Sequence, residues 1–258
     1  SIPAHIILNE VIGAHASHLQ GTIAVAGQRA DVIIANPNGI HCHGCGFYNV
    51  HHGVLTTGVP SFFDGRLSGF NVNQGRITIG AEGLVGYHAA NIDPAHIALI
   101  ATGVDIHGKI YAKQNGLNAT STALNNLQII TGKNTLALTQ ETQSASLIKD
   151  MSVSQTFSQD SAEGAAIDVG NLGGMYAKKI HLISTTQGIG VHSAGVIHAA
   201  DNLTIQASTV VNKSSGAMMS TAGDITVHVG KQFDNEGTFY AKKNLELLNS
   251  NQQHGHTT

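Results

Sequence analysis

Residues 30–49 read ADVIIANPNGIHCHGCGFYN, and this stretch decides the fold class more than any other part of the chain. An apolar run, residues 31–35, leads into Asn36-Pro37-Asn38-Gly39, and a second β-prone run follows the two cysteines. Proline presets φ, whereas asparagine and glycine tolerate positive φ, so the tetrapeptide predicts a sharp turn. We therefore expect a strand, a turn, a loop stapled by the cysteines and a second strand, which together make a corner in an all-β structure.

The composition favours a long β structure with a polar but weakly charged surface. Charged residues make up 11% of the 258, less than half the average of about 25% for globular proteins. Glycine is abundant, at 30 residues, and tryptophan is absent. The net charge is −3 and the lysines and arginines form no cluster, which argues against a nucleic-acid-binding protein. No apolar run is long enough to predict a membrane-spanning helix.

Internal repetition is the second strong signal. Gly195, Gly216 and Gly237 follow one another at intervals of 21 residues, and each precedes a short run, a polar turn and an alternating apolar pair. Short alternating strands at this period predict a right-handed parallel β-helix with extra-helical hairpins or loops. At 21 residues per rung the chain would form about 12 rungs. A β-propeller is the rival architecture, but its blades need about 40–50 residues.

Residues 139–166 lack a clean apolar pattern and are predicted to form an irregular segment. They divide the chain into a portion that carries the Asn-Pro-Asn-Gly turn, residues 1–138, and a portion with the regular repeats, residues 167–258.

Catalytic signatures are scarce. Residues 103–109 resemble a phosphate-binding loop, but Ile110 stands where a magnesium-binding Ser or Thr is needed, so we interpret them as a rung turn. The acidic residues of the middle region are scattered along the sequence, with no reason to converge: Asp93, Asp105, Asp160, Glu163 and Asp168. We therefore predict no catalytic residues.

The cysteine pair is the most reactive feature of the sequence. Cys42 and Cys45 could form a short disulfide or stay buried thiols, as expected in an oxidising compartment. Together with nearby imidazoles they could instead bind zinc; the candidates are His41, His43, His51 and His52. Thioredoxin-like redox chemistry is a third reading, but it needs a βαβ context. We favour the disulfide or paired thiols and expect neither metal nor cofactor, with most of the 16 histidines exposed on the rungs.

These residues resemble the N-terminal secretion domain of two-partner secretion exoproteins, the filamentous-haemagglutinin-like adhesins, haemolysins and contact-dependent inhibition proteins of Gram-negative bacteria. The similar stretches are residues 7–11, 19–21, 25–27, 30–40, 42–49, 55–60 and 167–177. The Asn-Pro-Asn-Gly-Ile run followed by the cysteine pair is the most specific of them.

The resemblance implies a surface β-helix that crosses the periplasm and leaves through a dedicated outer-membrane β-barrel transporter with POTRA domains. It also implies a secretion motif that the transporter recognises, at Asn36, Pro37, Asn38, Gly39 and Ile40. Cys42 and Cys45 match the cysteine pair of the haemolysin-like branch. The family's domain begins upstream with capping strands, so residues 1–138 are expected to be a secretion domain that lacks its N-terminal cap. Residues 167–258 are expected to be haemagglutinin-type repeats.

Three functions follow as hypotheses. The first is a non-enzymatic secretion and scaffold segment of a large adhesin or haemolysin, secreted or displayed on the cell surface and able to meet host cells. The second is a binding module for a host glycan or haem, supported by the abundance of histidine. The third is a polysaccharide-active β-helix enzyme, which needs convergent carboxylates.

Overall fold

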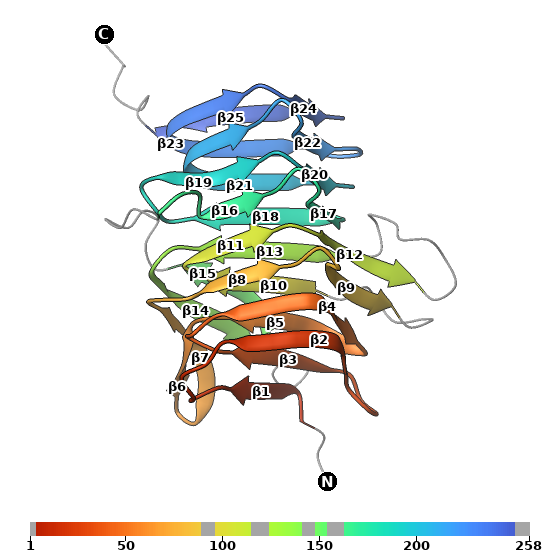
Figure 1. Cartoon of the computed structure of the whole chain (residues 1–258), viewed down its shortest axis with the longest axis vertical. Coiled ribbons are helices and arrows are strands. Elements are labelled where there is room, and N and C mark those ends of the chain that lie inside the picture. The colour runs from red at the N-terminus through yellow and green to blue at the C-terminus, as the bar shows by residue number, and fades with distance from the viewer. Residues whose placement is uncertain (1–3, 89–95, 115–123, 141–147, 154–162, 251–258) are drawn as a thin grey trace.

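A computed structural model describes residues 4–88, 96–114, 124–140, 148–153 and 163–250. Nearly all regular structure in these ranges is β-strand, and no helix in them is suited to cross a membrane. The strands stack into a rod with the chain termini at opposite ends (Figure 1). The parallel β-helix predicted from the repeats is therefore confirmed.

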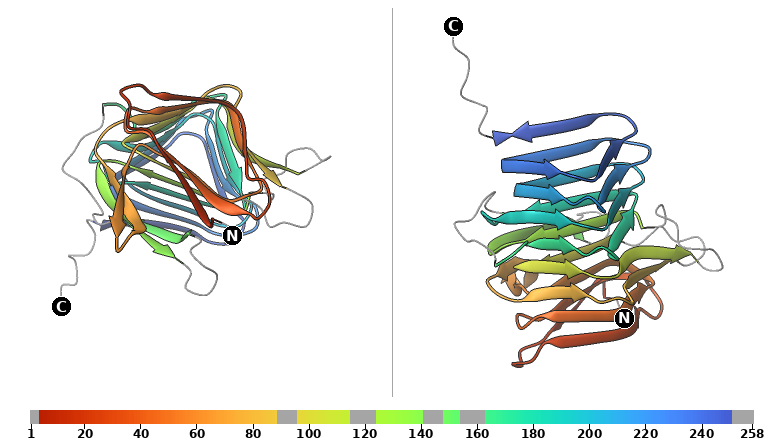
Figure 2. Two further views of the ribbon diagram at one scale, coloured as in Figure 1. Left: turned by 90° about the horizontal axis from the view of Figure 1, so that it is seen from below. Right: turned by 45° about the horizontal axis from the view of Figure 1, so that its top comes forward.

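Three parallel stacks of strands, which we name faces A, B and C, enclose the core of the rod (Figure 2). Face A consists of β1 (Ile6–Glu10), β3 (Ala30–Ala35), β5 (Val50–Thr56), β10 (His96–Ala101), β13 (Asn126–Thr131), β18 (Lys179–Ser184), the first halves of β21 (Leu203–Asn212) and β23 (Ile225–Asn235), and β25 (Leu245–Asn249).

Face B begins with the first halves of two long strands that bend at the next corner. It consists of β2 (Ser17–Ala24), β4 (Ile40–Tyr48), β8 (Arg76–Ile79), β11 (Gly103–Ile106), β16 (Ile167–Val169), β19 (Ile189–Ser193) and the second halves of β21 and β23. Face C consists of the second halves of β2 and β4, then β9 (Leu84–His88), β12 (Lys109–Gln114), β17 (Gly174–Ala177), β20 (Val196–Ala199), β22 (Ala217–Ser220) and β24 (Thr238–Ala241).

The alternation of buried and exposed side chains follows from the strand period of two. In β22 the side chains of Met218 and Ser220 are buried, while Ala217 and Met219 are half-exposed. Inward-facing aliphatic side chains from all three faces form one continuous core along the rod. Each level therefore buries its apolar side chains against the levels above and below it.

A second, antiparallel sheet lies outside the rod and covers part of face A (Figure 1). Its strands, in spatial order, are β15 (Ile148–Val153), β14 (Asn134–Gln140), β7 (Arg66–Val72) and β6 (Val59–Phe63). Apolar side chains of this sheet, including Phe70 and Leu136, pack on outward-facing residues of face A such as Ile100 and Ile130. The expected extra-helical hairpins are therefore present, and they form a second core.

The number of rungs was predicted wrongly. Face A has nine levels in the described residues instead of 12, because segments of the chain leave the parallel stacks to build the antiparallel sheet. His52 pairs with His96, 44 residues later, and Asn126 pairs with Lys179, 53 residues later. The 21-residue period holds further on, where Val196 pairs with Ala217 and Ala217 with Thr238.

The division of the chain at residues 138 and 167 stays a prediction. Of the predicted irregular segment, residues 141–147 and 154–162 lie outside the described residues, and residues 148–153 form β15. β13 and β18, which come from the two predicted portions, pair in register on face A.

Candidate secretion site

The turn predicted at residues 36–39 connects β3 on face A to β4 on face B. The Gly39 N–H donates to the Asn36 carbonyl at 3.1 Å, which closes the turn. Gly39 has a φ of +113°, a left-handed conformation that side chains with a Cβ rarely adopt, so glycine is required there. The local sequence chemistry thus accounts for the corner.

Asn36 is the centre of this corner, and its side chain is completely buried. Its Oδ1 accepts hydrogen bonds from the backbone N–H of Asn38 at 2.9 Å and from Asn38 Nδ2 at 3.1 Å. Its Nδ2 donates to the His15 carbonyl at 2.9 Å and to Ser17 Oγ at 2.8 Å. One amide therefore holds the turn closed and ties it to the preceding level of the rod.

Asn38 and Pro37 extend these ties in both directions along the rod. Asn38 Nδ2 donates to the Gly13 carbonyl at 2.6 Å, in the preceding level. The Pro37 carbonyl accepts from Gln74 Nε2 at 3.2 Å, in the following level. A Cβ at Gly75 would lie only 2.6 Å from the same carbonyl oxygen. The turn is therefore packed between two neighbouring loops.

The burial of residues 36–40 limits which of their atoms another protein can contact in the folded rod. Asn36, Gly39 and Ile40 are buried in the folded rod, and Pro37 and Asn38 are half-buried. All five predicted motif residues are thus brought together in one corner, but most of their surface is covered by their own chain.

Cys42 and Cys45 form a disulfide across the next corner, with Cα atoms 5.2 Å apart. Cys42 pairs with β8 of face B, whereas Cys45 pairs with β9 of face C. Gly44, between them, has a φ of +69°. The expected loop between two strands is wrong: one continuous strand, β4, runs through both cysteines, because it bends at Gly44 and stays paired on either side.

The four histidines considered with the cysteines separate into two groups. His41 and His43 lie with His18 in a stack of parallel rings on face B, where the His18 and His41 ring centroids are 4.8 Å apart. His51 and His52 lie on face A, where His51 Nδ1 is 2.8 Å from Asp31 Oδ1. Among the described residues, no three histidine, cysteine or acidic side chains are placed to hold a metal ion together.

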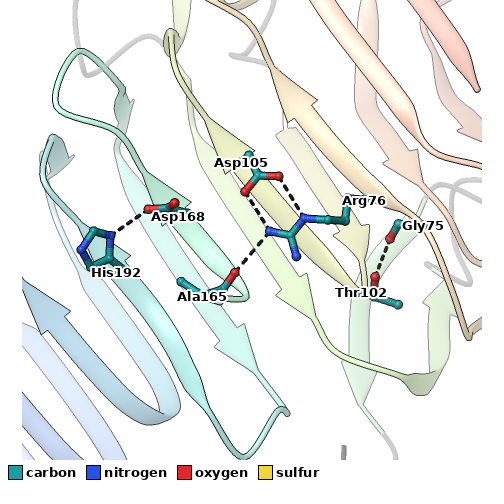
Figure 3. A network of polar contacts seen from close by, with 7 residues as sticks. All are labelled: Gly75, Arg76, Thr102, Asp105, Ala165, Asp168 and His192. Atoms are coloured by element: carbon teal, nitrogen blue, oxygen red, sulfur yellow. Dashed lines mark hydrogen bonds and ion pairs between the residues drawn. The ribbon is translucent and has the colours of Figure 1, made fainter. Parts of the chain in front are cut away.

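A polar network that the sequence reasoning missed crosses the outside of face B (Figure 3). The Arg76 guanidinium donates to both carboxylate oxygens of Asp105, at 2.9 and 2.8 Å, and to the Ala165 carbonyl at 3.2 Å. The hydrogen bond to Asp105 raises the pKa of Arg76 above its usual value, and the charges of Asp105 and Asp168 act in the same direction. A Cβ at Gly103 would lie 2.0 Å from Arg76 Nη1, so the guanidinium lies across this glycine.

The expectation that the acidic residues are scattered is wrong for two of them. Asp105 and Asp168 are register partners on β11 and β16, although 63 residues separate them in the sequence. Asp168 Oδ1 lies 2.8 Å from Nδ1 of His192, the next residue in the same column. Each carboxylate thus has a cationic or imidazole partner. The strand register that aligns Asp105 with Asp168 depends on the length of the segment between β11 and β16 that lies outside the rod.

Comparisons with known proteins agree with this architecture. A family model described as the TPS secretion domain matches residues 3–209. The chain is also similar to the crystal structure of the filamentous hemagglutinin secretion domain, with 28% sequence identity and a TM-score of 0.62. That match covers 96% of this chain and 76% of the other.

Curated relatives include two kinds of large protein. Toxin CdiA of Yersinia pestis is 37% identical over 248 residues, which is 93% of this chain. A hemolysin of Serratia marcescens is 34% identical over 214 residues, or 82% of this chain. The matched region spans only 6% of that CdiA and 12% of that hemolysin.

Proposed function

Since this chain belongs to the TPS secretion-domain family, we propose that the Asn36–Ile40 turn is the segment through which its outer-membrane transporter selects it. Members of this family are non-catalytic secretion modules of large exoproteins, and such modules engage an outer-membrane transporter. The exoproteins are secreted through the outer membrane and are released or stay at the cell surface. The chain is therefore an export segment that folds into a β-helix.

The burial of Asn36 is the observation that carries the proposal about the turn. Asn36 is 0% exposed in the folded rod, so a partner protein cannot contact its side chain there. We therefore place recognition before folding, when residues 30–48 are still extended. The POTRA domains of the transporter would bind this extended segment by β-augmentation, in which backbone hydrogen bonds give affinity and side-chain pockets give specificity.

Folding after export then takes the motif out of reach of the transporter. The amides of Asn36 and Asn38 move from the partner to His15, Ser17 and Gly13 of the same chain. Each apolar side chain buried in a new level contributes about 1.5–3 kcal/mol before entropy is subtracted. Release from the transporter and growth of the rod are thus coupled, and both oppose backward movement of the chain.

The experiment compares secretion of the full-length exoprotein by its transporter for Asn38→Ala and for a matched control, Asn49→Gly. Asn49 also donates two side-chain hydrogen bonds to a preceding loop, to the carbonyls of Val25 and Gly27 at 2.8 and 2.9 Å. Its φ of +55° is one that glycine adopts without strain. The control therefore removes similar contacts at another corner.

We expect Asn38→Ala to reduce secretion strongly and Asn49→Gly to reduce it little. We also expect a peptide of residues 30–48 to bind the isolated POTRA domains, and its Asn38→Ala form to bind more weakly. The proposal would be contradicted if the two variants were secreted equally and the wild-type and Asn38→Ala peptides bound the POTRA domains equally. The turn would then act only in folding.

The activity of the parent protein is a separate proposal. The similarity to CdiA proteins and to a hemolysin supports a large exoprotein whose effector lies outside this segment, because the match spans a small fraction of each relative. Contact with a host-cell surface would belong to the exposed faces of the rod.

A further inference from the structure

A surface cavity of about 320 Å³ lies on the outside of face A, in the part that the antiparallel sheet leaves uncovered. Its lining comes from successive levels of the rod, and the side chains used below are His52, His96, Asn126, Gln128, Lys179 and His181. We propose that this groove binds an acidic oligosaccharide. This inference goes beyond export and does not depend on how the transporter recognises the chain.

The residues of the groove form two parallel columns. His52, His96, Asn126 and Lys179 are successive register partners on β5, β10, β13 and β18. Gln128 and His181 are partners in the neighbouring column, two residues further along their strands. Polar groups thus repeat at the strand spacing of about 4.8 Å, which suits an extended ligand with repeated polar groups.

The chemistry of the lining excludes an apolar ligand. The three aliphatic residues that contribute to it, Ile97, Leu127 and Ile180, have buried side chains that belong to the inner core, so they offer the groove only backbone. The outward-facing groups are imidazoles, amides and one ammonium. These groups hydrogen-bond to hydroxyls and to anionic oxygens.

Side-chain contacts hold two residues of the groove in place. Asn126 Nδ2 lies 2.9 Å from His96 Nδ1. On the other side of the groove, Gln128 Nε2 donates to the Met151 carbonyl at 3.5 Å, which connects the groove to β15 of the outer sheet.

The charge of the groove favours an anion. No carboxylate is among the described residues that line the groove, and Asp31 and Asp224, in the strand levels beyond it, each make a side-chain contact with a neighbour. At one end Asp31 contacts His51 at 2.8 Å. At the other end Asp224 accepts from the backbone N–H and Nδ2 of Asn244, at 2.9 and 3.0 Å, in the next level. Lys179 is exposed, and no described carboxylate lies within ion-pair distance of its Nζ.

The test uses the whole chain and three hexasaccharides in isothermal titration calorimetry: hexagalacturonate, sulfated maltohexaose and uncharged maltohexaose. The variant is Lys179→Gln, and the matched control is Lys178→Gln. Lys178 is the adjacent exposed lysine, outside the groove, so the two variants change the net charge equally. Thermal unfolding of both variants verifies that they are folded.

We expect the wild-type protein to bind at least one acidic hexasaccharide more tightly than maltohexaose. Lys179→Gln should weaken this binding about fivefold, the effect of one partly exposed ion pair, whereas Lys178→Gln should leave it within about twofold. Three results would overturn the proposal: no saturable binding of either acidic sugar, equal affinity for the uncharged sugar, or a loss at Lys179 no larger than that at Lys178.

Discussion

At the scale of single residues, Gly103 shows how a missing side chain positions a charged one. Arg76 reaches Asp105 on the adjacent strand only because its guanidinium lies over Gly103, where a Cβ would be 2.0 Å from Nη1. The clash is with a side chain, so Arg76 can move, but it must then leave Asp105. Gly103 is required here by a neighbouring side chain and not by a turn.

We predict that Gly103→Ala lowers the free energy of unfolding by about 1 kcal/mol, because the displaced Arg76 loses its paired hydrogen bonds to Asp105. Denaturant titration measures this change. The same substitution in an Arg76→Ala background should have almost no effect, since no guanidinium remains to be displaced. A loss of equal size in both backgrounds would mean that the backbone, and not Arg76, is disturbed.

His198 on face C makes stability depend on pH. Burial lowers its pKa below the model-peptide value of 6.5. As the pH falls below that value, His198 is protonated in the unfolded chain more readily than in the folded chain. The free energy of unfolding therefore falls as the pH falls. We predict that wild-type protein loses more stability than His198→Asn between about pH 8 and about pH 5. Parallel pH profiles of the two proteins would contradict this assignment.

At the scale of elements, the sequence allows some strands and corners to be predicted and not others. The corner at Asn36 depends on local turn chemistry, and the rungs after Gly195 repeat at a constant interval, so both could be read from residue types and spacing. The antiparallel sheet could not, because its strands show the same alternation as the rung strands. The pairing of Asp105 with Asp168 was hidden for the same reason, since the length of the excursion sets their register.

We expect the packing of the outer antiparallel sheet on face A to stabilise the fold. Phe70 on β7 is completely buried between this sheet and face A, whereas Phe63 on the adjoining β6 is 79% exposed. We predict that Phe70→Ala lowers the free energy of unfolding by about 3–5 kcal/mol. Phe63→Ala removes the same side chain from the same hairpin and should change it by less than about 0.5 kcal/mol. If both substitutions had small effects in denaturant titrations, the sheet would not be docked on the rod in solution.

At the scale of the whole molecule, the rod is a stack in which each level contacts only its neighbours. The stability of such a protein is close to a sum of level and interface contributions. The excursions that reduce the predicted 12 levels to the nine of face A occur between levels and leave the register of the stacks intact. Length can therefore change by whole levels without changing the cross-section.

This property predicts that residues 196–216 can be deleted as a unit. The deletion joins Gly195 to Ala217, and Gly195 then takes the place of Gly216 before β22. It removes β20 and β21 together, so β17 meets β22 on face C, and β18 and β19 meet the two halves of β23. We expect the shortened protein to unfold cooperatively in denaturant, with a lower free energy of unfolding because one interface is lost.

Deletion of residues 207–216 is the matched control. It removes fewer residues than the first deletion, but these residues do not make up a whole level. It takes away the face B half of β21 and connects face A directly to β22 on face C, with no chain left to form the corner between them. The strands beyond that point cannot stay in register with those before it. We expect this variant to lose cooperative unfolding and to become sensitive to protease, although it retains more of the sequence. Comparable stability of the two deletions would contradict a rod built from whole levels.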